Sequence, residues 1–247
     1  MKLLKFLEQS LIFYPEKLPP EHSFQYDSPF EEITLAMQDG TKINSLYFNS
    51  QESKGIILYF HGNAGSLRSW GDVYREFLPN HWDLFITDYR SYGKSDGKPD
   101  EDLLYSDALE LYEYLVQKYP GKEIIPYGRS IGTAIAAYLA NHKKTKRLIL
   151  ETPYTDFPAI AKKYFPFVPG VILSYRLETK KYVDSYGGNT LILHGDRDEI
   201  IPVEMGREIG RLSERIRYVE VKGGYHNNLS TFRDTLKARK EFLNLEF

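Results

Sequence analysis

The feature that most limits the fold of this chain is an alternation of short apolar runs with segments of helical period. The runs Gly55–Phe60 and Trp82–Thr87 are almost continuously apolar, which is typical of strands buried on both faces. Asp102–Tyr119 then has helical spacing and leads into another apolar run, Glu123–Tyr127. Strands separated by helices form a mostly parallel central sheet with helices on both faces, so the sequence predicts an α/β fold.

The same alternation runs through the rest of the chain. Glu31–Met37 and Lys42–Phe48 flank Asp39-Gly40, which predicts an N-terminal antiparallel hairpin. A helical stretch is expected around Trp70–Leu78. In the second half, helices are expected at Thr133–Asn141, Val203–Leu212 and Ser230–Leu243, and strands at Lys146–Leu150, Thr190–His194 and Arg217–Val221.

The domain organisation follows from length and from the absence of a linker-like stretch. At 247 residues, the chain is expected to form a single domain, residues 1–247. Residues 1–30 are expected to form a helical and loop extension. Between residues 151 and 188 the rhythm breaks, with several prolines and an aromatic cluster, which predicts a small cap or lid insertion over the sheet edge where ligands bind.

The N-terminal segment Met1–Phe13 is short, leucine-rich and interrupted by polar residues. A spanning helix needs roughly 20 mostly apolar residues, so we expect an amphipathic helix that ends at Pro15. It either packs on the domain or makes peripheral contact with a membrane. The expected location is the cytoplasm, with membrane association as the alternative.

Composition removes several classes of function. Lys plus Arg number 32 and Asp plus Glu 34, so the formal net charge of −2 does not favour a nucleic-acid partner. There is no cysteine, which excludes a thiolate nucleophile and a thiolate metal site. Catalysis would therefore use oxygen and nitrogen groups, and we expect neither a cofactor nor a metal.

The most specific motif is Gly128-Arg129-Ser130-Ile131-Gly132, which lies directly after a predicted strand and directly before a predicted helix. This is the context of a nucleophile elbow, a sharp turn that exposes a serine hydroxyl. Glycine on either side lets the strand and the helix approach each other. The sequence therefore predicts Ser130 as a nucleophile.

A serine nucleophile needs a base, and the base needs an acid that orients it. His226 lies in a loop between the last predicted strand and the last predicted helix, and we expect it to be the base. His61 and His194 close strands beside glycine and are expected to be hydrogen-bonding loop residues. Asp198 is the expected acid. Asp196, which could form a turn with its own backbone, and Asp156 are the alternatives.

Acyl transfer also needs backbone donors for the tetrahedral oxyanion. The amide of Ile131 follows the nucleophile at a helix start, where free N–H groups and the helix dipole favour negative charge. The second donor is expected from the glycine-containing loop His61–Gly65, with the amide of Asn63 the first choice and that of Ala64 the second.

These motifs together resemble the α/β-hydrolase superfamily over nearly the whole chain from about Glu31. The segments HGNAGS, DYRSYGKSDGKP, YGRSIGT, LILHGDRDEIIP and GGYHNN occur in that family's order, although relatives usually have glycine where Ser91 stands. The segments HGNAGS and DYRSYGKSDGKP resemble those of an abhydrolase-domain subgroup described as serine aminopeptidase-like or esterase-like. The resemblance implies an α/β-hydrolase fold, a triad of Ser130, Asp198 and His226, and an oxyanion hole at Asn63 and Ile131.

The leading functional hypothesis is a serine hydrolase that cleaves a carboxylic ester or thioester of a small-molecule acyl substrate through an acyl-Ser130 intermediate. Serine at the elbow disfavours the dehalogenase and epoxide hydrolase branches, which use aspartate there. Apolar residues in the cap, including Phe167 and Leu173, favour an acyl chain. The alternatives are a peptidase or amidase acting on short peptides, and a non-catalytic binding protein with a hydrolase fold.

Overall fold

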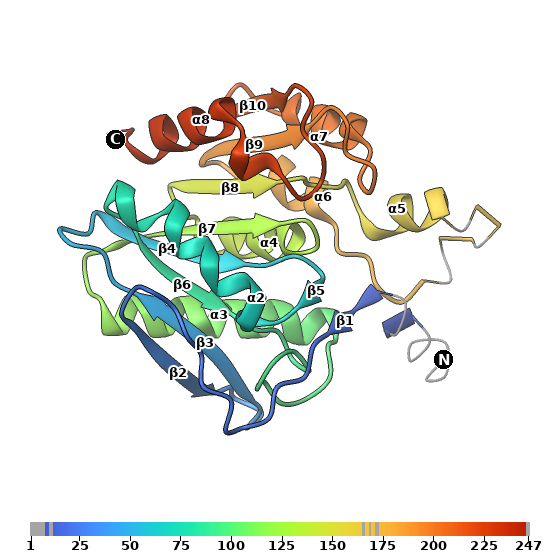
Figure 1. The fold of residues 1–247 in the computed structure, drawn as a ribbon. Helices are drawn as coiled ribbons and strands as arrows, with labels where there is room; N and C mark the ends of the chain where they lie inside the picture. The colour runs from blue at the N-terminus through green and yellow to red at the C-terminus, as the bar shows by residue number, and fades with distance from the viewer. Residues whose placement is uncertain (1–7, 10–11, 165, 168, 171–172, 246–247) are drawn as a thin grey trace. The chain divides into compact units, whose positions relative to one another are not determined.

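The computed structural model describes residues 8–9, 12–164, 166–167, 169–170 and 173–245. These residues group into two compact units, Met1–Ile125 and Pro126–Phe247. Both units combine strands with helices (Figure 1). Most of the predicted helix Met1–Phe13 lies outside the described residues, and so do Phe165, Val168, Val171 and Ile172 of the expected cap.

The first unit contains the predicted hairpin. Strand β2 (Phe30–Ala36) pairs antiparallel with β3 (Lys42–Phe48), and Gly40 in the turn has the positive φ that glycine allows. Strand β3 also lies antiparallel to β6 (Asp83–Thr87), which is parallel to β4 (Gly55–Phe60). All six residues of β4 are buried, as the apolar run predicts.

The helical parts of the first unit agree with the prediction at one place and differ at another. Helix α3 (Glu101–Lys118) is capped by Asp100, whose side chain accepts a hydrogen bond from the Asp102 amide. The helical stretch expected around Trp70–Leu78 is present, but not as one continuous α-helix. That region contains the short helix α2 (Leu67–Trp70) and the 3₁₀ turns η1 (Gly71–Glu76) and η2 (Leu78–Asn80). Gly71 and Pro79 both disfavour a continuous α-helix.

A parallel sheet forms the centre of the second unit. Its strands are β10 (Ile216–Val221), β9 (Asn189–Gly195), β8 (Arg147–Glu151) and the end of β7 (Glu123–Arg129), in that spatial order. Because the strands are parallel, their carboxyl ends meet at one edge. Arg129, Glu151 and Gly195 therefore end their strands at that edge.

Helices cover both faces of this parallel sheet. Tyr218 on β10 lies against Gly210 of helix α7 (Val203–Gly210), while its neighbour Arg217 binds Glu241 of helix α8 (Arg233–Leu243). Adjacent strand residues point to opposite faces, so α7 and α8 lie on opposite sides of β10. This confirms the predicted fold class, a mostly parallel sheet with helices around it.

Two helix boundaries of the second unit follow from local backbone geometry. Helix α4 (Gly132–Lys143) begins directly after Ser130-Ile131, close to the expected start. The helix expected from Ser230 begins later, because Phe232 is extended (φ −90°, ψ 134°) and separates the 3₁₀ turn η4 (Leu229–Thr231) from α8.

The expected cap region, residues 151–188, holds helices α5 (Phe157–Tyr164) and α6 (Thr179–Asp184) within loop segments. Among its described residues, Phe167 is 97% exposed and Tyr164 is 48% exposed. These are large apolar side chains in contact with solvent. That this segment covers a bound substrate stays a prediction. The expectation that the chain forms a single domain also stays a prediction.

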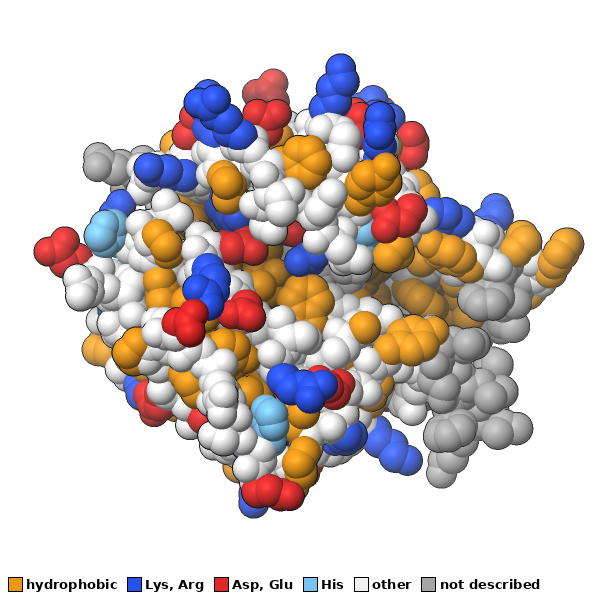
Figure 2. All heavy atoms as spheres, in the orientation of Figure 1, with side chains coloured by type: hydrophobic (Ala, Val, Ile, Leu, Met, Phe, Trp, Pro, Cys, Tyr) orange, Lys and Arg blue, Asp and Glu red, His pale blue; other side chains and the backbone are white. Residues whose placement is uncertain are grey.

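Charged side chains of both signs are interspersed on the face drawn in Figure 2, as the small net charge leads one to expect. No helix in the described part of the chain is both long and apolar enough to cross a bilayer.

Candidate active site

Ser130 lies in a sharp turn between β7 and α4. Its φ of 53° is in the left-handed region, which is unusual for a residue other than glycine. The surroundings hold this strained backbone in place. The Ser130 amide donates to the Glu151 carbonyl over 2.9 Å, and the Ser130 carbonyl accepts from the Thr133 amide at 3.0 Å and the Thr133 hydroxyl at 2.6 Å. Hydrogen bonds to the neighbouring strand and to the following helix therefore hold the strained backbone of Ser130.

The glycine two residues before the serine permits this turn. A Cβ atom on Gly128 would lie 2.4 Å from the Gly132 carbonyl oxygen and 2.6 Å from the Thr133 Cα. Both atoms belong to the backbone of α4, so a side chain at residue 128 would push the helix away from the strand. The close approach of β7 and α4 therefore requires glycine here.

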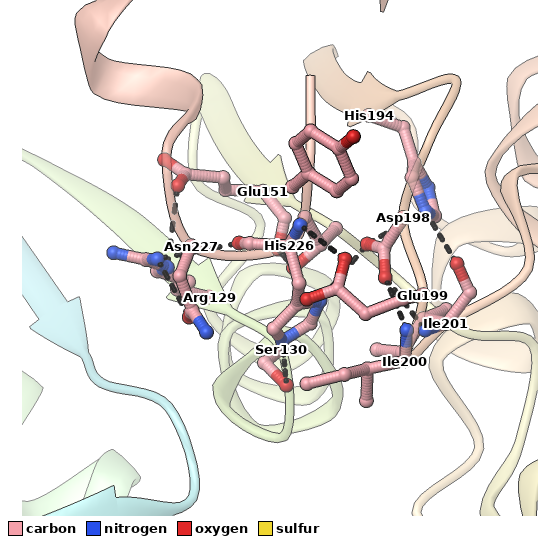
Figure 3. Close-up of polar contacts among 12 residues, drawn as sticks. Arg129, Ser130, Glu151, His194, Asp198, Glu199, Ile200, Ile201, His226 and Asn227 are labelled. Carbon is pink, nitrogen blue, oxygen red and sulfur yellow. Dashed lines mark hydrogen bonds and ion pairs between the residues drawn. The ribbon is translucent and has the colours of Figure 1, made fainter. Parts of the chain in front are cut away.

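The structure brings the side chains of Ser130, His226 and Asp198 together in one chain of hydrogen bonds (Figure 3). Nε2 of His226 lies 3.1 Å from Oγ of Ser130, and Nδ1 lies 2.9 Å from Oδ2 of Asp198. With the ring proton on Nδ1, the ring donates to the carboxylate and accepts from the serine hydroxyl. This arrangement can take the proton from Ser130 as its oxygen attacks an electrophile.

Asp198 is held by its own loop as well as by His226. Its Oδ1 accepts hydrogen bonds from the amides of Ile200 (2.9 Å) and Ile201 (2.7 Å). Burial alone would raise the pKa of Asp198. Hydrogen bonds from His194 and His226, the charge of His226 and the Ile201 amide outweigh it and hold the pKa well below the ordinary value. Asp198 therefore remains ionised and can stabilise a protonated His226.

His194 contacts the same carboxylate, a contact that sequence reasoning missed. The residue belongs to β9 and not to a loop, and its side chain is fully buried. Its Nε2 lies 3.3 Å from Oδ2 of Asp198 and 3.1 Å from the Ile201 carbonyl. Since a carbonyl can only accept, Nε2 carries a proton. The four-residue separation of His194 and Asp198 at a strand end was the available signal.

The two alternative acids have other roles. Oδ1 of Asp196 accepts from the Gly223 amide over 2.6 Å and so links the loop after β9 to the loop that carries His226. The expectation that Asp196 binds its own backbone is therefore wrong. Oδ1 of Asp156 accepts from the Ala159 amide over 2.9 Å, in the first turn of α5.

The two residues expected to form an oxyanion hole lie in different compact units. Ile131 is the residue before α4, so its amide is at a helix start as expected. In the first unit, the single hydroxyl proton of Tyr92 is shared between two acceptors of Asn63, the carbonyl at 2.5 Å and Oδ1 at 3.0 Å, and this contact holds the loop. His61 begins the same loop, and its Nε2 lies 3.3 Å from Oδ1 of the buried Asp88.

Within the described ranges, no cluster of three His, Cys, Asp or Glu side chains is arranged to hold a metal ion.

Comparison with known proteins places the chain in a family. The family model for the alpha/beta hydrolase fold matches residues 55–183. Protein bem46 of Schizosaccharomyces pombe is 32% identical over 213 residues, covering 78% of this chain and 71% of that protein. The lysophosphatidylserine lipase ABHD12 of Danio rerio is 28% identical over 78% of this chain, but over only 55% of its own length.

A solved structure supports the same assignment at the level of the fold. The Pyrococcus furiosus esterase Pf2001 superposes with a TM-score of 0.74 at 19% identity, covering 92% of this chain and 96% of the esterase. The chain belongs to the alpha/beta hydrolase family, and its relatives support a hydrolase activity. The resemblance and the fold expected from the sequence are thereby confirmed.

Proposed function

We propose that this protein is a serine hydrolase that cleaves carboxylic ester or thioester bonds of acyl substrates through an acyl-Ser130 intermediate. The observation that carries the proposal is the hydrogen-bonded series from Ser130 through His226 to Asp198. These three residues act as nucleophile, general base and orienting acid. The positive φ of Ser130 at the strand-to-helix turn is the backbone geometry of a nucleophile elbow.

The reaction proceeds in two balanced steps. Oγ of Ser130 attacks the substrate carbonyl carbon while Nε2 of His226 takes the hydroxyl proton. The C–O or C–S bond then breaks, and His226 gives that proton to the leaving alkoxide or thiolate. Water attacks the acyl-serine in the second step, His226 takes a proton from the water, and the proton returns to Ser130 as the acid is released.

The negative oxygen of each tetrahedral intermediate needs preorganised donors. We assign this role to the backbone amides of Ile131 and Asn63. The start of α4 favours negative charge at Ile131 through its unpaired amides and its dipole. For Asn63, the support is the contact of its loop with the Tyr92 hydroxyl.

The acyl class of the substrate is inferred from the apolar residues of the cap and from the relatives. Tyr164 and Phe167 offer exposed apolar surface, which suits an acyl chain better than a sugar or a charged group. A lysophosphatidylserine lipase is among the relatives and an esterase is among the solved structures with this fold. Both names describe enzymes that act on esters.

A substrate panel tests the proposal. Turnover is measured with p-nitrophenyl acyl esters of increasing chain length, with acyl thioesters and with aminoacyl p-nitroanilides. We expect hydrolysis of esters and thioesters and none by Ser130→Ala. Preferred cleavage of the anilides would indicate a peptidase or amidase. Absence of turnover on every substrate, together with no labelling by a fluorophosphonate, would indicate a non-catalytic binding protein.

We further propose that the protein is cytoplasmic. The amphipathic pattern of Met1–Phe13 leaves two alternatives for this segment, packing on the domain or peripheral contact with a membrane. Liposome co-sedimentation of the full chain and of a version lacking these residues tests the contact. Equal partition of the two proteins would contradict it.

A further inference from the structure

A largely buried arginine directly precedes Ser130. Arg129 ends β7, and its side chain is 11% exposed. Its Nη2 donates to the backbone carbonyl of His226 over 3.3 Å and to Oδ1 of Asn227 over 3.2 Å. Figure 3 shows the guanidinium group reaching from the strand end to the loop that carries His226. The residue beside the nucleophile thus binds the loop of the base.

The guanidinium group is in turn held by a carboxylate from the neighbouring strand. Nε of Arg129 lies 3.3 Å from Oε1 of Glu151, whose side chain is 3% exposed. The other carboxylate oxygen of Glu151 accepts a hydrogen bond from the hydroxyl of Tyr127. Because each charge is compensated within the protein, the buried pair does not carry the full desolvation penalty of an isolated ion.

Together with the Ser130–His226 hydrogen bond, these contacts form a ring of interactions that starts and ends at Ser130. The Ser130 amide binds the Glu151 carbonyl, the Glu151 carboxylate binds Arg129, and Arg129 binds the His226 carbonyl. His226 returns to Ser130 through its ring. Displacing the guanidinium group would therefore remove one of the links that hold the loop of the base beside the nucleophile. The bonds of Asp196 to the Gly223 amide and of Asp198 to the His226 ring would remain.

We propose that Arg129 is a positioning residue that fixes the His226 loop, so that Nε2 of His226 stays within hydrogen-bonding distance of the Ser130 hydroxyl. Glu151 orients the guanidinium group for this purpose. Arg129 touches the loop backbone and Asn227, and acts on the reaction only through His226. The inference deepens the proposed function and rests on it wherever reactivity is the readout.

The variants are Arg129→Met, Arg129→Lys and Asn227→Ala, measured by the rate of fluorophosphonate labelling and by kcat and KM for a p-nitrophenyl ester. A misplacement of about 1 Å lowers reactivity by about 10²-fold, so Arg129→Met should lose roughly that factor in labelling rate and kcat. KM should change by less than about threefold, because uniform binding is retained. Arg129→Lys should recover part of the loss, since an ammonium group can still donate to the His226 carbonyl.

Arg147 provides a matched control in the same unit. It is also a buried arginine, it donates to the carbonyls of Phe242 (3.0 Å) and Leu243 (2.9 Å), and it begins β8 at the opposite end from Glu151. Arg147→Met should lower the melting temperature and leave the labelling rate within about twofold of wild type. Equal labelling by Arg129→Met and wild type would overturn the proposal, as would an equal loss in both Met variants.

Asn227→Ala removes one of the two contacts that Arg129 makes with the loop, and Arg129→Met removes both. The labelling rate of the double variant Arg129→Met/Asn227→Ala should therefore be no lower than that of Arg129→Met alone. If Arg129→Met does not fold, Arg129→Lys and Asn227→Ala decide. In that case, labelling of both at the wild-type rate would refute the role.

A second readout separates failure of this inference from failure of the proposed function. The Nδ1 proton of His226, which lies in the hydrogen bond to Asp198, should give a downfield NMR signal that is lost in His226→Ala and that reports this bond without any turnover. We expect this signal to weaken or shift in Arg129→Met and to persist in Arg147→Met. If the wild-type protein is unreactive but the NMR signals follow this pattern, the proposed function is contradicted and the positioning role of Arg129 stands. If the signal is unchanged in Arg129→Met, the positioning role is contradicted and the proposed function stands.

Discussion

The substitution Gly128→Ala tests whether the close approach of β7 and α4 holds Ser130 in its reactive position. The added Cβ would lie 2.4 Å from the Gly132 carbonyl oxygen, whereas ordinary van der Waals contact begins at 3.4 Å. The strand and the helix must therefore separate by about 1 Å, the difference between these two distances. Overpacking of this kind costs about 1–3 kcal/mol of unfolding free energy.

The displacement also reaches the nucleophile, because Ser130 lies between the two elements that separate. A shift of about 1 Å should lower kcat by about 10²-fold. A loss of 1–3 kcal/mol should lower the melting temperature by roughly 2–12 °C in a chain of this size. The assays are p-nitrophenyl ester turnover and thermal unfolding followed by circular dichroism.

Gly187→Ala is the matched control. An added Cβ there meets no atom within 4 Å, so this variant should retain both activity and stability. If Gly128→Ala instead matched wild type in melting temperature and stayed within about twofold in kcat, the claim that this contact positions the serine would be refuted.

The remaining predictions concern Asp198. Asp198→Asn should lower kcat by about 10⁴-fold at neutral pH while leaving the fold intact, because the amide no longer fixes the His226 tautomer or stabilises its charge. A decrease of less than tenfold would contradict this role. Because the folded-state pKa of Asp198 is lowered, its ionised form stabilises the protein above the unfolded-chain value of 3.8, and that stability is lost as the pH falls further. The unfolding free energy of wild type relative to Asp198→Asn should thus be constant above about pH 5 and decrease below it; a constant difference down to pH 3 would exclude the coupling. In His194→Phe, one stabilising hydrogen bond to the carboxylate is absent, so the folded-state pKa of Asp198 should be lowered less; the decrease should still begin near the unfolded-chain value but be smaller and be complete at higher pH, and an unchanged profile would remove His194 from this network.

Much of the fold could be predicted because the elements carry strong local signals. The apolar run Gly55–Phe60 and the helical period before Lys118 are properties of neighbouring residues, and both elements appear at the expected places. The helical stretch predicted around Trp70–Leu78 is present, but its division into short pieces was not predicted. Gly71 and Pro79 broke the segment into short turns there.

The candidate site was predictable in its residues but not in its contacts. Ser130 and His226 each occupy a distinctive loop between a strand and a helix, so chain order was sufficient to nominate them. Side-chain partners depend on tertiary packing, which leaves no periodic signal. The contact of His194 with Asp198 and the ion pair of Arg129 with Glu151 could be found only in three dimensions.

The most direct measurement of the central claim is the site of covalent modification by a fluorophosphonate, determined by mass spectrometry. Trypsin cuts after Arg129 and after Lys143, so the peptide of residues 130–143 contains Ser130 as its only serine. We predict one adduct per chain, located on Ser130, that is abolished by Ser130→Ala and formed far more slowly in His226→Ala. An adduct on another residue, or labelling that does not depend on His226, would contradict the account.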